Sequence, residues 1–157
     1  MNTKKERHKI IPEVYIVLQK NNKILLMLRQ NTGFMDGFYG LPSGHVELYE
    51  TPVGAIIREA QEEVGIQLQQ SNLKSIHTLY RLSVDKQERV GFFFTMVKWK
   101  GNPQNKEPHK CQEISWFSVN QLPHNLMPYL KTILTHIDKK VAYSELIENP
   151  KKHTNKK

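Results

Sequence analysis

Three glutamates in one short segment, Glu59, Glu62 and Glu63, constrain this chain more than any other feature. If the segment is helical, residues at these spacings of three and four are neighbours on the helix surface. Carboxylates gathered in this way repel each other unless a cation lies between them. A surface helix usually relieves such repulsion with lysine, but Arg58 is the only cation in this turn. The pattern therefore indicates a divalent metal site rather than a solvated helix face.

The segment carries the local signals of a helix over 52–64. Thr51 is a suitable N-cap, and Pro52 suits the first helical position, where its missing N–H costs nothing. Gly65 suits the left-handed residue that often ends a helix. An apolar stripe that would face the core consists of Val53, Ile56, Ile57, Ala60 and Val64. Before the helix, Gly44 lets a backbone carbonyl approach closely and supply a further oxygen ligand.

These residues together resemble the signature of the Nudix hydrolases. In that signature a glycine, five residues, a glutamate and seven further residues precede a run of arginine, three glutamates and a glycine. Every fixed position is filled in this chain, by Gly44, Glu50, Arg58, Glu59, Glu62, Glu63 and Gly65, and the two aliphatic positions are filled by Ala60 and Ile66. The resemblance implies a strand, a loop and a helix in this order.

Apolar runs elsewhere in the chain predict the remaining elements. Two buried strands are expected at 14–18 and 24–28, joined by a turn at Asn21-Asn22. Two further β-rich runs, at 73–83 and 89–100, are expected to form a hairpin.

A short strand is expected at 113–117 and a closing helix at 126–139. The inward residues of that helix should be Leu130, Ile133, Leu134 and Ile137. Strands mixed with two helices predict an α/β sandwich, with helices on either side of a mixed sheet. This is also the fold that the Nudix resemblance implies.

Length and composition set the outer limits. A chain of 157 residues suits one domain, which we expect at 11–145 between basic tails at 1–10 and 146–157. The net charge of +8 supports an anionic ligand. Cys111 is the single cysteine, so no internal disulfide forms, and no apolar run reaches the length of a membrane span. We therefore expect a cytoplasmic protein.

Outside the signature, three residues are candidates for substrate binding. The resemblance implies that Arg29, at the end of the second strand, contacts a substrate phosphate, and a guanidinium suits that task. An exposed arginine at a strand end is the alternative. His45 follows Gly44 directly and is also within reach of a phosphate. The resemblance further implies that Asn125 hydrogen-bonds the base.

A fourth carboxylate is expected from the segment 107–117. This segment resembles one found in Nudix proteins that cleave nucleoside triphosphates, where a carboxylate outside the signature completes the metal site or acts as base. Glu107 and Glu113 are the candidates, and Glu107 is preferred because it lies in the loop. His109 and Cys111 are too few residues to indicate a zinc site.

The resemblance implies a catalytic arrangement as well. Mg²⁺, with Mn²⁺ as a substitute, would be bound by Glu59, Glu62, Glu63 and the Gly44 carbonyl. The general base would be Glu62 or Glu63, with Glu107 or Glu113 as alternatives. A charge pair between Arg58 and Glu50 would orient the metal-binding carboxylates.

We expect the substrate to be a nucleoside polyphosphate, and the leading hypothesis is cleavage of a (deoxy)nucleoside triphosphate to the monophosphate and pyrophosphate. The alternatives within enzymes are cleavage of ADP-ribose or a nucleotide sugar, and removal of pyrophosphate from RNA 5′ ends. A non-catalytic nucleotide sensor is the alternative from another class, and the intact set of signature carboxylates disfavours it. The resemblance is compatible with a homodimer.

Overall fold

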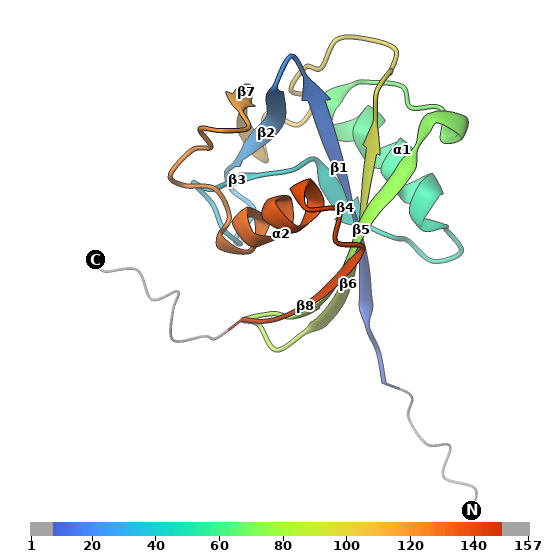
Figure 1. Cartoon of the computed structure of the whole chain (residues 1–157), viewed down its shortest axis with the longest axis vertical. Coiled ribbons are helices and arrows are strands. Elements are labelled where there is room, and N and C mark those ends of the chain that lie inside the picture. The colour runs from blue at the N-terminus through green and yellow to red at the C-terminus, as the bar shows by residue number, and fades with distance from the viewer. Residues whose placement is uncertain (1–7, 149–157) are drawn as a thin grey trace, which may run out of the picture.

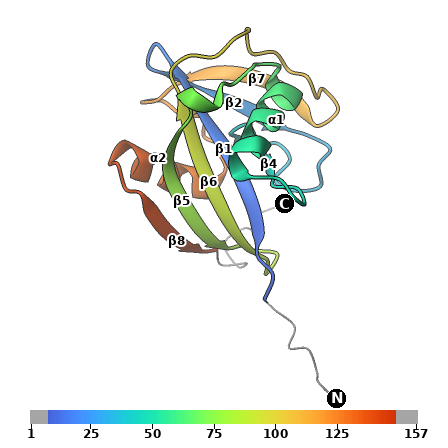
Figure 2. The same ribbon diagram turned by 90° about the vertical axis from the view of Figure 1, so that its right-hand side faces the viewer.

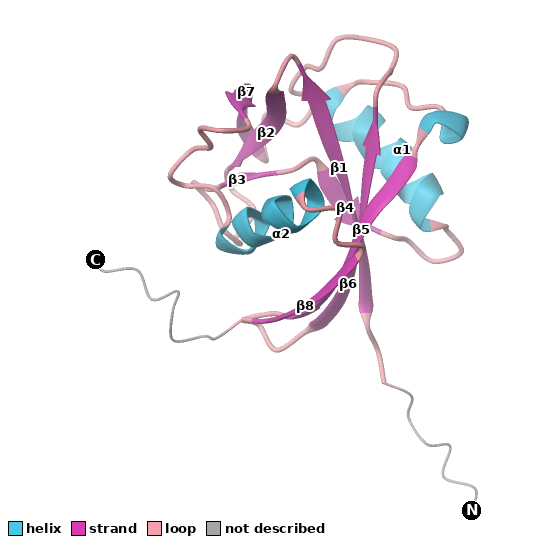
Figure 3. Ribbon diagram, viewed as in Figure 1, coloured by secondary structure: helices cyan, strands magenta, loops and turns pink. Residues whose placement is uncertain are grey.

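A mixed β-sheet between two helices forms this protein, whose computed structural model describes residues 8–148 (Figure 1). Helix α1 (Pro52–Val64) lies against one face of the sheet and α2 (Pro128–Asp138) against the other. Figure 2 faces the side that carries α1, and Figure 3 separates helices from strands by colour. The arrangement confirms the expected α/β/α sandwich. Most of the two expected basic tails, 1–10 and 146–157, lies outside the described residues.

Eight strands and one short 3-10 helix accompany these two helices. The strands are β1 (Ile11–Lys20), β2 (Lys23–Arg29), β3 (Tyr39–Gly40), β4 (Ser43–His45), β5 (Lys74–Leu82), β6 (Glu88–Met96), β7 (Cys111–Ser118) and β8 (Tyr143–Ile147), and the 3-10 helix is Gln70–Asn72. The strand order is β3-β2-β1-β6-β5-β8, with β4 paired to β1 and β7 paired to β2. The pairs β1–β6 and β5–β8 are parallel and the others antiparallel, which makes the sheet mixed.

Strand β1 is buried on both faces because successive side chains of a strand point to opposite sides of the sheet. Val14, Ile16 and Leu18 pack in the cluster that contains α1, whereas Tyr15 and Val17 pack in the cluster that contains α2. This explains why the apolar run at 14–18 is continuous rather than alternating. Strand β1 therefore separates the two halves of the core.

The turn between β1 and β2 forms where the Asn-Asn pair predicts it. Asn21 and Asn22 both have positive φ, 52° and 58°. Two consecutive positive φ values are typical of the type I′ turn, whose twist matches that of the flanking strands, and asparagine tolerates this conformation.

Helix α2 confirms the closing helix but starts two residues later than expected, with Pro128 in its first turn. Leu130 and Ile133 are buried, and Leu134 and Ile137 are partly buried against the same cluster. Neither described helix is both long and apolar enough to span a membrane.

Two strands, β3 and β8, were not expected from the sequence, whereas β4 is the strand that the Nudix resemblance implies before the loop and α1. Strand β3 has only two residues, too short for a periodic pattern. Strand β8 pairs in parallel with β5, and it extends to Ile147, beyond residue 145, where we expected the domain to end. Because its partner is more than 60 positions away in the chain, no local signal identifies it.

Candidate metal and nucleotide site

Helix α1 presents the glutamates, and its ends form where the sequence predicts them. The Thr51 side chain accepts a hydrogen bond from Gly54 N, and Pro52 occupies the first turn. Gly65 adopts φ 69°, ψ 23°, the left-handed conformation that ends the helix. Glu59 and Glu63 therefore lie at the edge of the apolar face of α1, and Glu62 is more exposed, at 54%.

Strand β4 places Gly44 directly beside α1. Gly44 pairs with Val14 of β1, so its position is determined by the central sheet. A β-carbon at this position would lie 1.9 Å from Oε1 of Glu59. Only glycine therefore allows the backbone and this carboxylate to come so close.

Arg58 connects the loop before α1 to the glutamates on the helix. Its Nε and Nη2 donate to the two carboxylate oxygens of Glu50, at 3.0 and 2.9 Å. Its Nη1 donates to Glu59 at 2.7 Å and to Glu62 at 3.2 Å, and Nη2 also donates to the carbonyl of His45 at 3.0 Å. The hydrogen bond to Arg58 lowers the pKa of Glu50. The charge pair expected between Arg58 and Glu50 is present.

Glu63 is the most buried of these carboxylates. Its Oε2 accepts a hydrogen bond of 2.7 Å from Ser43 N. Burial raises the pKa of Glu63 to about 8, with a further contribution from the charges of Glu59 and Glu107. Burial also raises the pKa of Glu59, although Arg58 opposes this. Both groups are thus held in surroundings that disfavour their ionised forms while no cation is bound.

Glu107 joins this group because its loop is bonded to the last turn of α1. Gln104 N donates to Val64 O at 2.9 Å, and Lys106 N donates to Glu63 O at 3.0 Å. These bonds use helix carbonyls that have no partner within the helix. Glu107 itself pairs with Lys110 at 2.9 Å, and the hydrogen bond to Glu107 raises the pKa of Lys110.

A cavity of about 780 Å³ brings these groups together. One part is lined by the acidic group of Glu59, Glu62, Glu63 and Glu107, with Gly44, Arg58 and Lys110. Arg29 and His45 line it as well. Cavities of this size are common for nucleotide-sized ligands.

The other sequence candidates lie at different places. Glu50 is not among the lining residues and contacts the site through Arg58. Glu113 lies on β7, where it accepts a hydrogen bond from the Tyr39 hydroxyl, and it does not line the cavity. Asn125 does not line it either, and its amide donates to Gly37 O at 2.7 Å. Its role in binding the base stays a prediction.

Arg29 and His45 differ in how firmly they are held. Arg29 donates from Nε to Phe34 O and from Nη2 to the Thr32 hydroxyl, both at 3.0 Å. It therefore orders the loop after β2 while lining the cavity. His45 is largely exposed, and its Nε2 lies 3.8 Å from Glu13.

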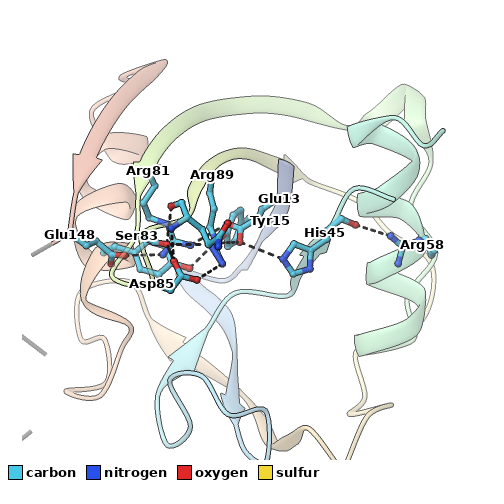
Figure 4. A network of polar contacts seen from close by, with 11 residues as sticks. Glu13, Tyr15, His45, Arg58, Arg81, Ser83, Asp85, Arg89 and Glu148 are labelled. Carbon is cyan, nitrogen blue, oxygen red and sulfur yellow. Dashed lines mark hydrogen bonds and ion pairs between the residues drawn. The ribbon is translucent and has the colours of Figure 1, made fainter. Parts of the chain in front are cut away.

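A second polar group lines the cavity and was missed by sequence reasoning. It consists of Glu13, Tyr15, Arg81, Asp85, Arg89 and Tyr129. Figure 4 shows Arg81, Arg89 and Glu13 on one side of His45 and Arg58 of α1 on the other. The sequence signal that could have found this group was Arg81. It lies two residues after Leu79 in β5, so both side chains point to the same buried face of the sheet, where a charged residue is unusual.

The chemistry of the acidic group fits a divalent cation. Its donors are carboxylate oxygens and the Gly44 carbonyl, which are the hard ligands that Mg²⁺ prefers. In their present rotamers, no three acidic, histidine or cysteine side chains within 8–148 converge as ion ligands. The reason is visible in the contacts, since Arg58 binds Glu59 and Glu62, and Lys110 binds Glu107.

Comparison with known proteins matches the chain to one domain family and to several enzymes. The model of the NUDIX domain matches residues 9–137. The chain is 31% identical over 109 residues to an 8-oxo-dGTP diphosphatase of Escherichia coli (strain K12), covering 68% of this chain and 81% of that protein. It is also 31% identical over 135 residues to an ADP-ribose pyrophosphatase of Methanocaldococcus jannaschii, covering 83% of this chain and 76% of the relative.

Solved structures resemble the fold as well. A MutT NUDIX hydrolase from Burkholderia pseudomallei superimposes with a TM-score of 0.74 at 23% identity, over 82% of this chain and 98% of that one. At this identity the likeness concerns the fold.

Proposed function

The chain belongs to the NUDIX domain family of hydrolases, and on this premise we propose that it cleaves a (deoxy)nucleoside triphosphate to the monophosphate and pyrophosphate. The observation that carries the proposal is the lining of the 780 Å³ cavity by four carboxylates, Glu59, Glu62, Glu63 and Glu107, together with Arg29. Carboxylates would hold divalent cations, and the arginine would bind phosphate oxygens.

In this proposal Glu59, Glu62, Glu63, Glu107 and the Gly44 carbonyl hold the cation. Mg²⁺, or Mn²⁺ in its place, supplies charge neutralisation at the phosphates and lowers the pKa of water when it is bound. The residues supply the geometry, because Ser43 N orients Glu63 and Gly44 leaves room for Glu59.

The reaction needs one proton acceptor from the chain. Water attacks the α- or the β-phosphorus, its proton passes to a carboxylate, and the bond from that phosphorus to the oxygen that bridges the two breaks, which gives the monophosphate and pyrophosphate. Glu62 or Glu63 takes the proton, with Glu107 as the alternative, since all three line the cavity. Glu113, the other alternative considered from the sequence, points to Tyr39 instead.

Arg58 and Glu50 act by positioning. The two-pronged contact between them orients the guanidinium, which in turn contacts Glu59 and Glu62. If Glu59 and Glu62 bound a cation instead, the contacts of Arg58 with Glu50 and with His45 O would still hold its guanidinium in place.

The test is a panel of nucleotides with Mg²⁺, in which release of pyrophosphate is measured. At least one nucleoside triphosphate should be cleaved, and Glu63→Gln should lower its kcat/KM by at least about 100-fold. Glu145→Gln is the matched control, because Glu145 is on β8 and contacts Tyr143 outside the cavity. It should retain full activity.

Two other outcomes bear on the substrate. Turnover of ADP-ribose or a nucleotide sugar, with no cleavage of any triphosphate, would refute the proposal in favour of the activity that the Methanocaldococcus relative's name describes. Cleavage of triphosphorylated RNA alone would favour removal of pyrophosphate from RNA 5′ ends. The affinity of the protein for RNA should then fall steeply as the salt concentration rises. Binding without any turnover would indicate a sensor. The cytoplasmic location and the homodimer stay predictions.

A further inference from the structure

Arg81 is a buried cation at the part of the cavity away from α1. Its side chain is 3% exposed, and it lines the cavity. The guanidinium carbon lies 4.2 Å from the centre of the Tyr129 ring, so one face of the group is stacked on an aromatic ring. The mechanism proposed above gives Arg81 no role.

Two carboxylates hold Arg81 in place. Nη2 donates to Glu13 at 3.2 Å, and Nη1 donates to Glu148 at 3.5 Å. Arg89 binds the other oxygen of Glu13, at 3.0 Å (Figure 4). Because its contacts come from β1, from α2 and from the residue after β8, the guanidinium is oriented by three separate parts of the fold.

The guanidinium of Arg81 keeps donors free for a ligand. An arginine has five N–H groups, and only two of those of Arg81 have an acceptor among residues 8–148. Glu13, the cavity carboxylate beside it, already accepts three hydrogen bonds, from Arg81, Arg89 and the Tyr15 hydroxyl, out of about four that a carboxylate can accept. This part of the cavity therefore offers hydrogen-bond donors and little acceptor capacity.

The balance of charge argues against an anion there. Three carboxylates, of Glu13, Asp85 and Glu148, stand against two guanidiniums, of Arg81 and Arg89. The group has no surplus of positive charge with which to bind a second phosphate. A neutral group that carries hydrogen-bond acceptors suits it best.

We propose that Arg81 is a specificity residue that donates hydrogen bonds to the exocyclic oxygen of the substrate's base, so that the enzyme prefers oxo bases over amino bases. The inference rests on the proposed function, because it assumes that the phosphates bind at the acidic group. Arginine commonly binds the oxygen and the adjacent ring nitrogen of a purine in this way. An amino group at the same place is itself a donor and cannot accept a hydrogen bond from Arg81. A buried polar group would then be left unpaired.

Two pairs of nucleotides test the proposal on the unaltered protein. Inosine and adenosine triphosphates differ in oxygen against amino at one carbon of the base, together with the ring proton beside it, and so do uridine and cytidine triphosphates. The oxo member of each pair should have a kcat/KM higher by at least about tenfold. Equal values within both pairs, or a preference for the amino members, would overturn the proposal.

Two variants, Arg81→Gln and Arg89→Gln, test whether Arg81 is the residue responsible for the preference for oxo bases. In Arg81→Gln the amide both donates and accepts, so the ratio of oxo to amino substrates should fall toward one. Arg89→Gln removes another partner of Glu13, and in Arg89 each of the three nitrogens donates one hydrogen bond within residues 8–148, whereas the Nε of Arg81 donates none. This control should keep the ratio of the unaltered protein. A ratio that survives in Arg81→Gln and collapses in Arg89→Gln would contradict the assignment.

Failure of the inference and failure of the proposed function are distinguishable. If triphosphates are cleaved without an oxo preference, the inference alone is wrong. If no triphosphate is cleaved, the proposed function is wrong, and calorimetry with inosine and adenosine monophosphates still tests Arg81. Binding of inosine monophosphate at least about tenfold more tightly would support the inference, and equal affinities or no binding of either would overturn it.

Discussion

At Gly44, a β-carbon would meet the carboxylate of Glu59, with 1.9 Å to its Oε1 and 2.0 Å to its carboxyl carbon. The reason for glycine here is space, because Gly44 is not among the residues with positive φ. A residue that carries no functional side chain therefore determines where Glu59, a proposed metal ligand, can lie.

The variant Gly44→Ala should displace Glu59 and lower kcat/KM by at least about tenfold, since small misplacements of catalytic groups are costly. The fold should persist, because the displaced carboxylate is near the cavity. Gly40→Ala is the control for adding a methyl group at the cavity, since Gly40 also lines it but its β-carbon would meet Met127 at an ordinary 3.5 Å. Equal activity of both variants and the unaltered enzyme would contradict this account, and steady-state kinetics with thermal unfolding would decide it.

Cys111 lines the cavity, yet it should be chemically inert in the folded protein. Its side chain is 3% exposed, and burial raises the pKa of its thiol to about 11. Because the thiolate is the reactive form, alkylation should stay slow up to about pH 10 and accelerate only as the pH approaches 11. Measuring the alkylation rate against pH, with and without denaturant, checks this. An inflection near the ordinary thiol pKa of about 8.5 in the native protein would disprove it.

Among the elements, α1 depends on the ends that its sequence predicts. The Thr51 hydroxyl accepts a hydrogen bond of 3.1 Å from Gly54 N. Thr51→Ala should lower the free energy of unfolding by about 1 kcal/mol, as measured by urea denaturation. Thr51→Ser keeps the acceptor and serves as control. The cap would have no role if the alanine variant were as stable as the serine one.

Helices and strands could be predicted from the sequence where the residues that begin and end them lie within the same segment. Helix α1 and the hairpin of β1 and β2 have their stop signals within the segment itself, in Thr51, Gly65 and the Asn21-Asn22 turn. Strand β8 has none, because its partner β5 is distant in the chain. Yet β8 matters, since Glu148, which binds Arg81, directly follows it.

At the scale of the whole molecule, burial of the ionised Glu59 and Glu63, whose pKa values it raises, opposes folding at neutral pH, and a bound cation would relieve this cost. Mg²⁺ should therefore raise the free energy of unfolding, by about 2.7 kcal/mol when the free ion is at 100 times its dissociation constant. Thermal unfolding with added Mg²⁺ or with a chelator measures the effect. In Glu63→Gln the stabilisation should shrink, whereas in Glu145→Gln it should remain. An equal shift in both variants, or none in any protein, would refute the metal site.

The sequence by itself determined the parts of this protein in which neighbours along the chain interact. Spacings of three and four residues place Glu59, Glu62 and Glu63 on adjacent positions of one helix, and the caps of that helix are local. The same pattern identified the family that the NUDIX domain match shows.

Only the tertiary structure decided what surrounds those glutamates. Glu107 reaches them because its loop bonds to carbonyls of α1, and Glu113 does not because β7 turns it toward Tyr39. Arg81 lines the same cavity through partners in β1 and after β8. Such contacts join residues tens of positions apart, and their geometry follows from how the strands pair and pack rather than from any spacing along the chain.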